Sequence, residues 1–257
     1  MALTEWWDDA GVPGDMRVKP PVAEAQPSAP TFTKKPDEPQ KVEPRRLRID
    51  PIREATKLAA SADSPITLKN AVSGFNGCDL KLTARNTVLF DGAPNADIML
   101  IGEAPGVDED KQGKPFVGRS GQLLDRMFAT ISHNRQTSLY ITNVLPWRPP
   151  GNRDPSPDEI AVCKPFLERQ IELVSPKLIV TVGRISTQAV LGGTQSILKV
   201  RGKQMTYRQP SLGADLPCIP FLHPAYILRR PAEKSKAWRD LLIIDKIASE
   251  LGAQKAK

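Results

Sequence analysis

Four short apolar runs alternate with segments of helical periodicity along this chain. The runs cover residues 96–101, 138–143, 177–182 and 217–222. A continuous apolar run of this length is typical of a strand that is buried on both faces. The alternation predicts an α/β fold, with helices on both sides of a central four-stranded, mainly parallel sheet. This arrangement is a three-layer α/β/α sandwich.

The helical segments are predicted from apolar residues that recur every three or four positions. The clearest one covers residues 158–174 and follows Ser156 and Pro157, which favour a helix start. Further helices are predicted from about residue 65, over 121–131 and 186–191, and from about 232 to 251. Together these elements predict one domain over residues 64–253.

Residues 1–60 differ in composition from the rest of the chain. Prolines recur there among Lys, Glu, Gln and Ala. Such a segment buries too little apolar surface to offset its ordering entropy, so we expect a Pro-rich, largely disordered tail. Leu3, Trp6 and Trp7 are its apolar exception. They form either a patch that docks on a protein partner or on the domain, or an exposed, frayed end.

Charge and cysteine content limit the partners and the compartment. The net charge is +7 and the sequence pI is about 9.4. An acidic partner such as nucleic acid fits that charge, although many basic proteins bind no polymer. Three widely spaced cysteines argue against a disulfide framework. No apolar run reaches the roughly 18 residues of a membrane span, and the acidic start is unlike a signal peptide. We therefore expect a cytoplasmic monomer.

Unusual sequences follow each of the four predicted strands. They are residues 102–106 (GEAPG), 143–153, 183–184 and 223–226 (HPAY). Ligands bind at the carboxyl ends of the strands in sheets of this class. The sequence therefore predicts a binding site at that edge.

The first of these segments favours close contact with a ligand. Gly102 and Gly106 allow backbone to approach a ligand, and Pro105 stiffens the turn. An ordinary tight turn is the alternative. Phe116 lies in a glycine-rich loop, where an aromatic side chain is suited to stacking on a planar base.

Asn143 and His223 are the polar candidates at the strand ends. A side-chain amide offers a donor beside an acceptor, which matches the N3–H and O4 edge of uracil and mismatches cytosine. An asparagine that satisfies turn backbone is the commoner case. His223 is either functional or structural, whereas the other histidine, His133, lies in a polar loop and is expected to be structural.

Taken together, three stretches resemble the uracil-DNA glycosylase superfamily, and specifically its iron–sulfur type, family 4. They are GEAPGVDEDKQGKPFVGRSGQLLDRM, YITNVLPWRPPGNRDPSPDEIAVCKPFLERQIELVSPKLIVTVG and FLHPAYILRRP. They cover most of residues 97–231 in the family's order. The resemblance implies a monofunctional enzyme of base excision repair that flips uracil out of single- or double-stranded DNA. It would hydrolyse the N-glycosidic bond and leave an abasic site.

The resemblance also implies roles for individual residues. Asn143 would read the polar edge of uracil, His223 would donate to its O2 atom, and Glu103 would hold the attacking water. Phe116 would stack on the base, and Glu109 would exclude the thymine methyl group. The rest of the uracil pocket would be Gly102, Ala104, Pro105 and Gly106. The DNA contacts would be Arg148, Arg153, Arg184, Tyr226, Leu228 and Arg229.

The sequence departs from family 4 at the cluster ligands. That family binds a 4Fe–4S cluster through four cysteines, and here Phe75 and Trp147 stand at two of the four positions. Cys78 and Cys163 remain. A cluster needs thiolates. We therefore predict no cluster and no metal, with the two aromatic side chains packing apolar surface in that place.

Three functions remain open at this point: a glycosylase, a non-catalytic protein that binds uracil or abasic DNA, and a basic tether whose tail recruits a partner. Glu103, Asn143 and His223 are all present, which favours the enzyme.

Overall fold

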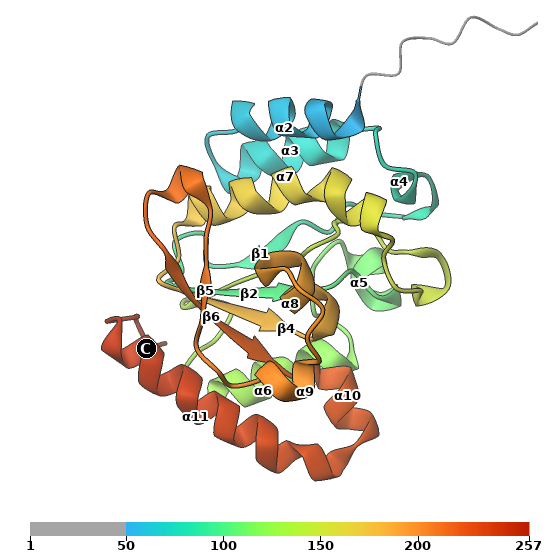
Figure 1. Ribbon diagram of the computed structural model, residues 1–257. Coiled ribbons are helices and arrows are strands. Elements are labelled where there is room, and N and C mark those ends of the chain that lie inside the picture. Colours follow the sequence, from blue (N-terminus) through green and yellow to red (C-terminus); the bar gives the residue numbers. More distant parts are fainter. Residues whose placement is uncertain (1–49, 257) are drawn as a thin grey trace, which may run out of the picture. The chain divides into compact units, whose positions relative to one another are not determined.

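The computed structural model describes residues 50–256, and these form one six-stranded sheet between two layers of helices (Figure 1). The strands are β1 (Phe90–Gly92), β2 (Ile98–Gly102), β3 (Leu139–Asn143), β4 (Leu178–Val182), β5 (Met205–Tyr207) and β6 (Leu216–Phe221). Their order is β1-β3-β2-β4-β6-β5. The four predicted strands are confirmed, and they run parallel. The short edge strands β1 and β5 pair antiparallel and add to the predicted four.

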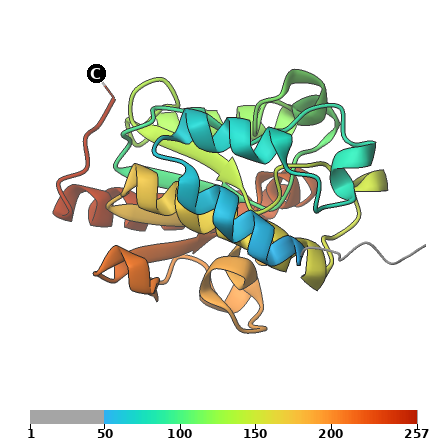
Figure 2. The ribbon, with the colours of Figure 1, turned by 90° about the horizontal axis from the view of Figure 1, so that it is seen from above.

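The helices cover both faces of the sheet. They are α2 (Pro51–Ser61), α3 (Pro65–Gly74), α4 (Leu80–Thr83), α5 (Val107–Gln112), α6 (Arg119–Ala129), α7 (Pro157–Val174), α8 (Arg184–Leu191), α9 (Ile197–Val200), α10 (Pro224–Arg229) and α11 (Lys234–Glu250). Helices α2, α3 and α7 lie side by side over one face (Figures 1 and 2). Helices α6, α10 and α11 cover the other.

Successive residues of each central strand face opposite layers, as the pleat requires. In β2, Met99 and Ile101 pack under α2, α3 and α7, whereas Ile98 and Leu100 pack toward α6 and α11. All five residues of β2 are buried. Burial on both sides explains why these strands are continuous apolar runs in the sequence.

Local sequence fixes where α3 and α7 begin. Helices α3 and α7 each start with a serine and a proline, and each has a capping box. In α7 the Ser156 hydroxyl accepts from Glu159 N, and the Glu159 carboxylate accepts from Ser156 N. Both orphaned amides are thereby satisfied, and the predicted helix starts are confirmed.

The ordered domain begins earlier than the sequence predicted. The expected tail ended at residue 60, but Pro51–Ser61 forms α2. Asp50 caps this helix by accepting from Ile52 N, and the small buried residues Ala55 and Ala59 let it pack closely on its neighbours. The predicted tail and its Leu3, Trp6 and Trp7 patch otherwise lie outside the described residues. Within the described range, no helix is both long and apolar enough to cross a membrane.

Candidate active site

A cavity of about 580 Å³ lies at the carboxyl ends of the parallel strands. Eleven of the predicted site residues line it: Glu103, Ala104, Pro105, Gly106, Glu109, Phe116, Asn143, Arg153, Arg184, His223 and Arg229. Gly102 lies directly behind this lining, as described below. The predicted Arg148, Tyr226 and Leu228 are not part of the lining. The structure thus brings together all four strand-end segments.

At the bottom of the cavity, Asn143 belongs to the lining and Gly102 lies directly behind it. They are the last residues of the neighbouring strands β2 and β3, and they pair with each other in the sheet. A Cβ atom on Gly102 would lie 2.3 Å from Asn143 Oδ1 and 2.5 Å from Phe116 Cε2. Only glycine permits this approach, so the predicted need for Gly102 has a specific cause.

The Asn143 side chain is enclosed by its neighbours, but its amide group is left free to bind a ligand. Its residue is 4% exposed, and its Oδ1 atom faces Gly102. Its amide makes no hydrogen bond within the part of the chain that the structure describes. Asn143 therefore has its donor and its acceptor available to a molecule in the cavity.

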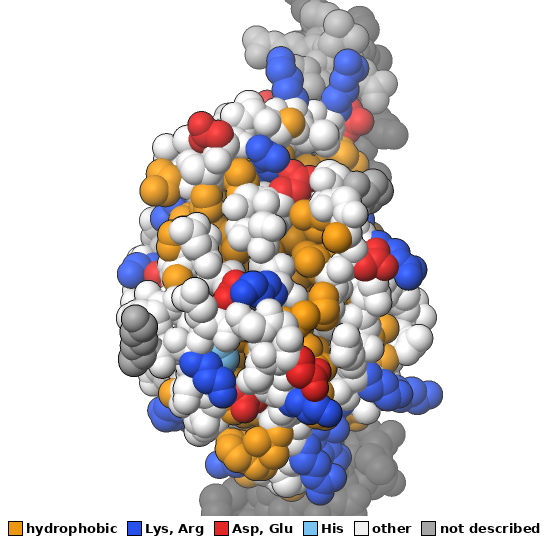
Figure 3. Space-filling model, turned by 90° about the vertical axis from the view of Figure 1, so that its left-hand side faces the viewer, with side chains coloured by type: hydrophobic (Ala, Val, Ile, Leu, Met, Phe, Trp, Pro, Cys, Tyr) orange, Lys and Arg blue, Asp and Glu red, His pale blue; other side chains and the backbone are white. Residues whose placement is uncertain are grey.

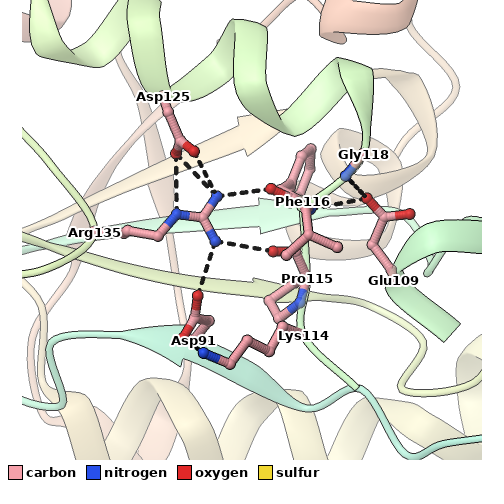
Figure 4. A network of polar contacts seen from close by, with 9 residues as sticks. Asp91, Glu109, Lys114, Pro115, Phe116, Gly118, Asp125 and Arg135 are labelled. Atoms are coloured by element: carbon pink, nitrogen blue, oxygen red, sulfur yellow. Dashed lines mark hydrogen bonds and ion pairs between the residues drawn. The ribbon is translucent and has the colours of Figure 1, made fainter. Parts of the chain in front are cut away.

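Phe116 closes one side of the cavity. Its ring centroid is 5.9 Å from that of His223, with an angle of 32° between the ring planes. The backbone φ of Phe116 is +53°, in the left-handed region that bulky residues rarely adopt. On the next residues, Glu109 Oε1 accepts from Val117 N at 3.0 Å and Gly118 N at 2.9 Å (Figure 4). Glu109 therefore lines the cavity and also fixes the turn that carries Phe116.

His223 caps the short helix α10. Its Nδ1 atom accepts a hydrogen bond from Ala225 N at 3.1 Å, which requires a lone pair on Nδ1. Burial, with a smaller effect from Arg229, lowers the pKa of His223 to about 4. At neutral pH the imidazole is therefore neutral and carries its proton on Nε2. His223 is a hydrogen-bond donor to the cavity.

Glu103 has a carboxyl group that titrates near neutral pH. Burial, together with a smaller effect from the charge of Asp154, raises the pKa of Glu103 to about 7, although Arg184 partly opposes both. A carboxylate in this position can accept a hydrogen bond from a water molecule. Perturbed pKa values of this kind often occur at functional sites.

Most of the predicted DNA-binding arginines already have partners in the protein. Arg184 pairs with Asp154 at 2.6 Å, Arg153 pairs with Glu159 at 2.6 Å, and Arg148 Nε donates to Asn152 Oδ1 at 2.8 Å. Arg229 is exposed and has no ion pair among the residues that the structure describes. Figure 3 shows a face on which Lys and Arg side chains stand singly or in small groups among acidic and apolar ones.

The predicted insertion segment after His223 is a helix of six residues, α10. Leu228 is 38% exposed on it. Tyr226, by contrast, is partly buried against the core below the sheet, and the Arg230 guanidinium lies 5.6 Å from its ring centroid. Leu228 and Tyr226 were both predicted to contact DNA, but Leu228 is exposed whereas Tyr226 is partly buried.

Several residues of the cavity were not predicted. They are Asp108, Gly118, Arg119, Ser120, Pro149, Asn152, Gly183 and Ala225. Gly183 has a signal in the sequence, because it follows a predicted strand. Its φ is +101°, and a Cβ atom there would lie 3.2 Å from His223 Cβ. Pro149, Asn152 and Ala225 also lie in the strand-end segments singled out in the sequence. The remaining four lie in or beside α5 and the start of α6, where no local pattern indicates a site.

Aromatic side chains pack tightly at the positions of the missing cysteines. Phe75 and Trp147 are each 1% exposed, with ring centroids 6.4 Å apart and 24° between the planes. Phe75 also packs edge-on against Phe166, and Trp147 Nε1 donates to Thr87 Oγ1 at 3.1 Å. Cys78 and Cys163 are free cysteines that are buried in the same core as these rings. Two thiols and two rings do not fit a cluster that needs four thiolate ligands.

Comparison with known proteins identifies what this arrangement is similar to. The family model described as "Uracil DNA glycosylase superfamily" matches residues 89–242, a range that contains the whole cavity lining. The chain is 41% identical over 194 residues to the type-4 uracil-DNA glycosylase of Sulfurisphaera tokodaii, covering 72% of this chain and 87% of that protein. It is 44% identical over 158 residues to the protein of that name from Saccharolobus solfataricus, covering 60% and 72%. For the Thermotoga maritima protein of the same name, the identity is 42% over 159 residues, covering 62% and 80%.

Proposed function

Since the chain belongs to the uracil-DNA glycosylase superfamily and is a DNA glycosylase of that family, we propose that it is monofunctional and cleaves uracil from DNA during base excision repair. It flips the uracil nucleotide out of single- or double-stranded DNA, hydrolyses the bond between the base and the sugar, and leaves an abasic site.

The observation that carries this proposal is the convergence of Asn143, Phe116 and His223 on one cavity. The free Asn143 amide complements uracil, since Oδ1 accepts from N3–H and Nδ2 donates to O4. Cytosine presents the opposite pattern on the same edge. The Phe116 ring offers a surface on which the flipped base stacks.

The same side chains explain how the bond breaks. As the bond between C1′ and N1 lengthens, its electrons move into uracil and the sugar becomes cation-like. The neutral His223 donates from Nε2 to the uracil O2 atom, where negative charge gathers. A donor placed in advance at such an oxygen stabilises the transition state more than the substrate.

Glu103 acts as the base for the water molecule that completes the reaction. The ionised carboxylate accepts a hydrogen bond from this water and receives its proton as oxygen bonds to C1′. A base must lie within hydrogen-bond reach of the proton that it takes. Glu103 meets the first condition for this role, because it lines the same cavity as Asn143 and His223.

A labelled oligonucleotide with one uracil tests the proposal. Incubation followed by alkali cleaves the strand wherever an abasic site has formed. We expect wild-type protein to release uracil, and we expect His223→Ala and Asn143→Ala each to slow release by about 10²–10³-fold while the fold survives. Wild-type protein that shifts this DNA on a gel without cleaving it would instead support a non-catalytic binding protein. Wild-type rates in both variants would refute the site.

The absence of an iron–sulfur cluster is part of the proposal. It is supported by the packed Phe75 and Trp147 rings, which leave only Cys78 and Cys163 as thiols at the four positions. Iron and acid-labile sulfide are to be measured on protein purified without oxygen, together with a visible absorption spectrum. A brown protein that contains iron and sulfide would overturn this part.

A further inference from the structure

The turn that carries Phe116 is held from two sides by groups of opposite charge. The left-handed φ of +53° is unfavourable for a phenylalanine, so the surrounding structure must maintain it. On one side, Glu109 accepts from the amides of Val117 and Gly118. On the other side, a largely buried arginine binds the carbonyl groups that precede them (Figure 4).

That arginine is Arg135, which lies in the loop before β3. Its side chain is 13% exposed. It donates from Nη1 to Pro115 O at 3.2 Å and from Nη2 to Phe116 O at 2.7 Å. Two carboxylates orient the guanidinium: Asp91 of β1 at 2.8 Å and Asp125 of α6 at 2.9 Å. Arg135 itself does not line the cavity.

A third contact leaves the turn little freedom. A Cβ atom on Gly121 would lie 1.8 Å from Phe116 O, so the backbone of α6 is pressed against the turn. The Phe116 carbonyl therefore lies between the α6 backbone and the Arg135 guanidinium. Loss of the guanidinium would remove the donor that Arg135 provides to the carbonyls of Pro115 and Phe116, and the Phe116 ring would no longer have one fixed position.

We infer that Arg135 is a positioning residue for uracil release, which holds the Phe116 ring where the flipped base stacks. The inference rests on the proposed function. The planar guanidinium suits this role because it presents several N–H groups in a fixed plane, toward two carbonyls and two carboxylates at once. A lysine ammonium cannot reach all four acceptors.

A double-mutant cycle separates positioning from general stability. Uracil release is measured with enzyme in excess for wild type, Arg135→Gln, Phe116→Ala and the double variant. We expect each single change to slow release by about tenfold or more, the order expected from base stacking. In the Phe116→Ala background, Arg135→Gln should slow release by less than about twofold, because it acts only through the missing ring.

Arg201 supplies a matched control. Its side chain is also largely buried, at 17% exposed, and it pairs with Asp240 at 2.6 Å and donates to the Lys236 carbonyl. It does not line the cavity. Arg201→Gln should lower the melting temperature yet leave the release rate unchanged well below that temperature. If Arg135→Gln is unfolded in its circular dichroism spectrum, Arg135→Lys takes its place in the cycle, since it keeps a cation between the two carboxylates.

The outcomes are distinguishable. Wild-type protein that releases no uracil defeats the proposed function and this inference with it. With an active wild type, equal slowing by Arg135→Gln in both backgrounds overturns the positioning role and leaves the proposed function intact. Wild-type rates in folded Arg135→Gln overturn it as well.

Discussion

At the scale of single residues, burial shifts the pKa values of Glu103 and His223 in opposite directions. The pKa of Glu103 is raised to about 7, and that of His223 is lowered to about 4. As the pH falls from about 7 toward about 4, Glu103 takes up a proton while His223 stays neutral. The pair thus provides one group that changes charge near neutral pH and one fixed donor.

The first prediction concerns the pH dependence of uracil release. Glu103 accepts from water only when it is ionised, so the rate should rise as the pH increases through about 7. His223 does not titrate in that range. Single-turnover rates between about pH 5 and 9 test this for wild type and Glu103→Gln. The variant should be slower and should lack the rise; a rise near pH 7 that survives in it would assign the titration to another group.

The second prediction concerns the stability of the same variant. A carboxyl group whose pKa is higher in the folded protein binds its proton more tightly there, so its contribution favours folding at low pH and is lost as the pH rises through about 7. Glu103→Gln should therefore raise the free energy of unfolding by about 1–3 kcal/mol at pH 8 and change it little at pH 5. Urea denaturation at both pH values measures this.

The exposed Glu250 serves as control: Glu250→Gln should have a small, similar effect on the free energy of unfolding at both pH values. A loss of stability in Glu103→Gln at pH 8 would contradict the argument.

At the scale of elements, strand ends were predictable and loop conformations were not. Residues 96–101 and 138–143 were predicted as strands, and the structure has Ile98–Gly102 and Leu139–Asn143. Full burial made those runs continuous, so Asn143 and His223 could be placed at the correct edge of the sheet. Edge strands of three residues have no such pattern, because pairing with a neighbour creates them.

Other residues depended on contacts between distant parts of the chain. Arg135 reaches Asp91, which is 44 residues away, and the backbone of Phe116. Neither contact leaves a local signature. Asp110 is a further example. It is buried and accepts from Arg85 N at 2.8 Å, 25 residues away in the sequence.

The third prediction concerns the helix α10. Leu228 is the exposed apolar residue on it, whereas Tyr226 is partly buried. An apolar wedge matters where flipping leaves a gap between stacked base pairs. Leu228→Ala should therefore slow release from double-stranded DNA several-fold more than release from the single strand. The ratio of the two rates is the measurement, and Leu242→Ala, which removes an exposed leucine of α11, is the matched control. Equal slowing on both substrates would count against a wedge.

At the scale of the whole molecule, helices α2, α3 and α7 and the residues around Phe75 form one continuous core. Phe75 and Trp147 are among the largest fully buried side chains of the described domain, and Cys78 and Cys163 lie in the same core. In this position, aromatic packing can stabilise the protein without any metal. The packing also connects the segment after α3 with the loop after β3, which leads back to the cavity.

The fourth prediction follows from that packing. If the core holds no cluster, as proposed, protein unfolded in urea with a strong chelator should refold without added iron, regain its full rate of uracil release and show an unchanged melting temperature. Trp147→Ala should instead lower the free energy of unfolding by about 3–5 kcal/mol, the usual loss for a fully buried aromatic side chain. Trp238→Ala is the matched control, since Trp238 is 46% exposed on α11 and its loss should have a much smaller effect. Refolding that depends on added iron and sulfide would show that the aromatic core does not replace a cluster.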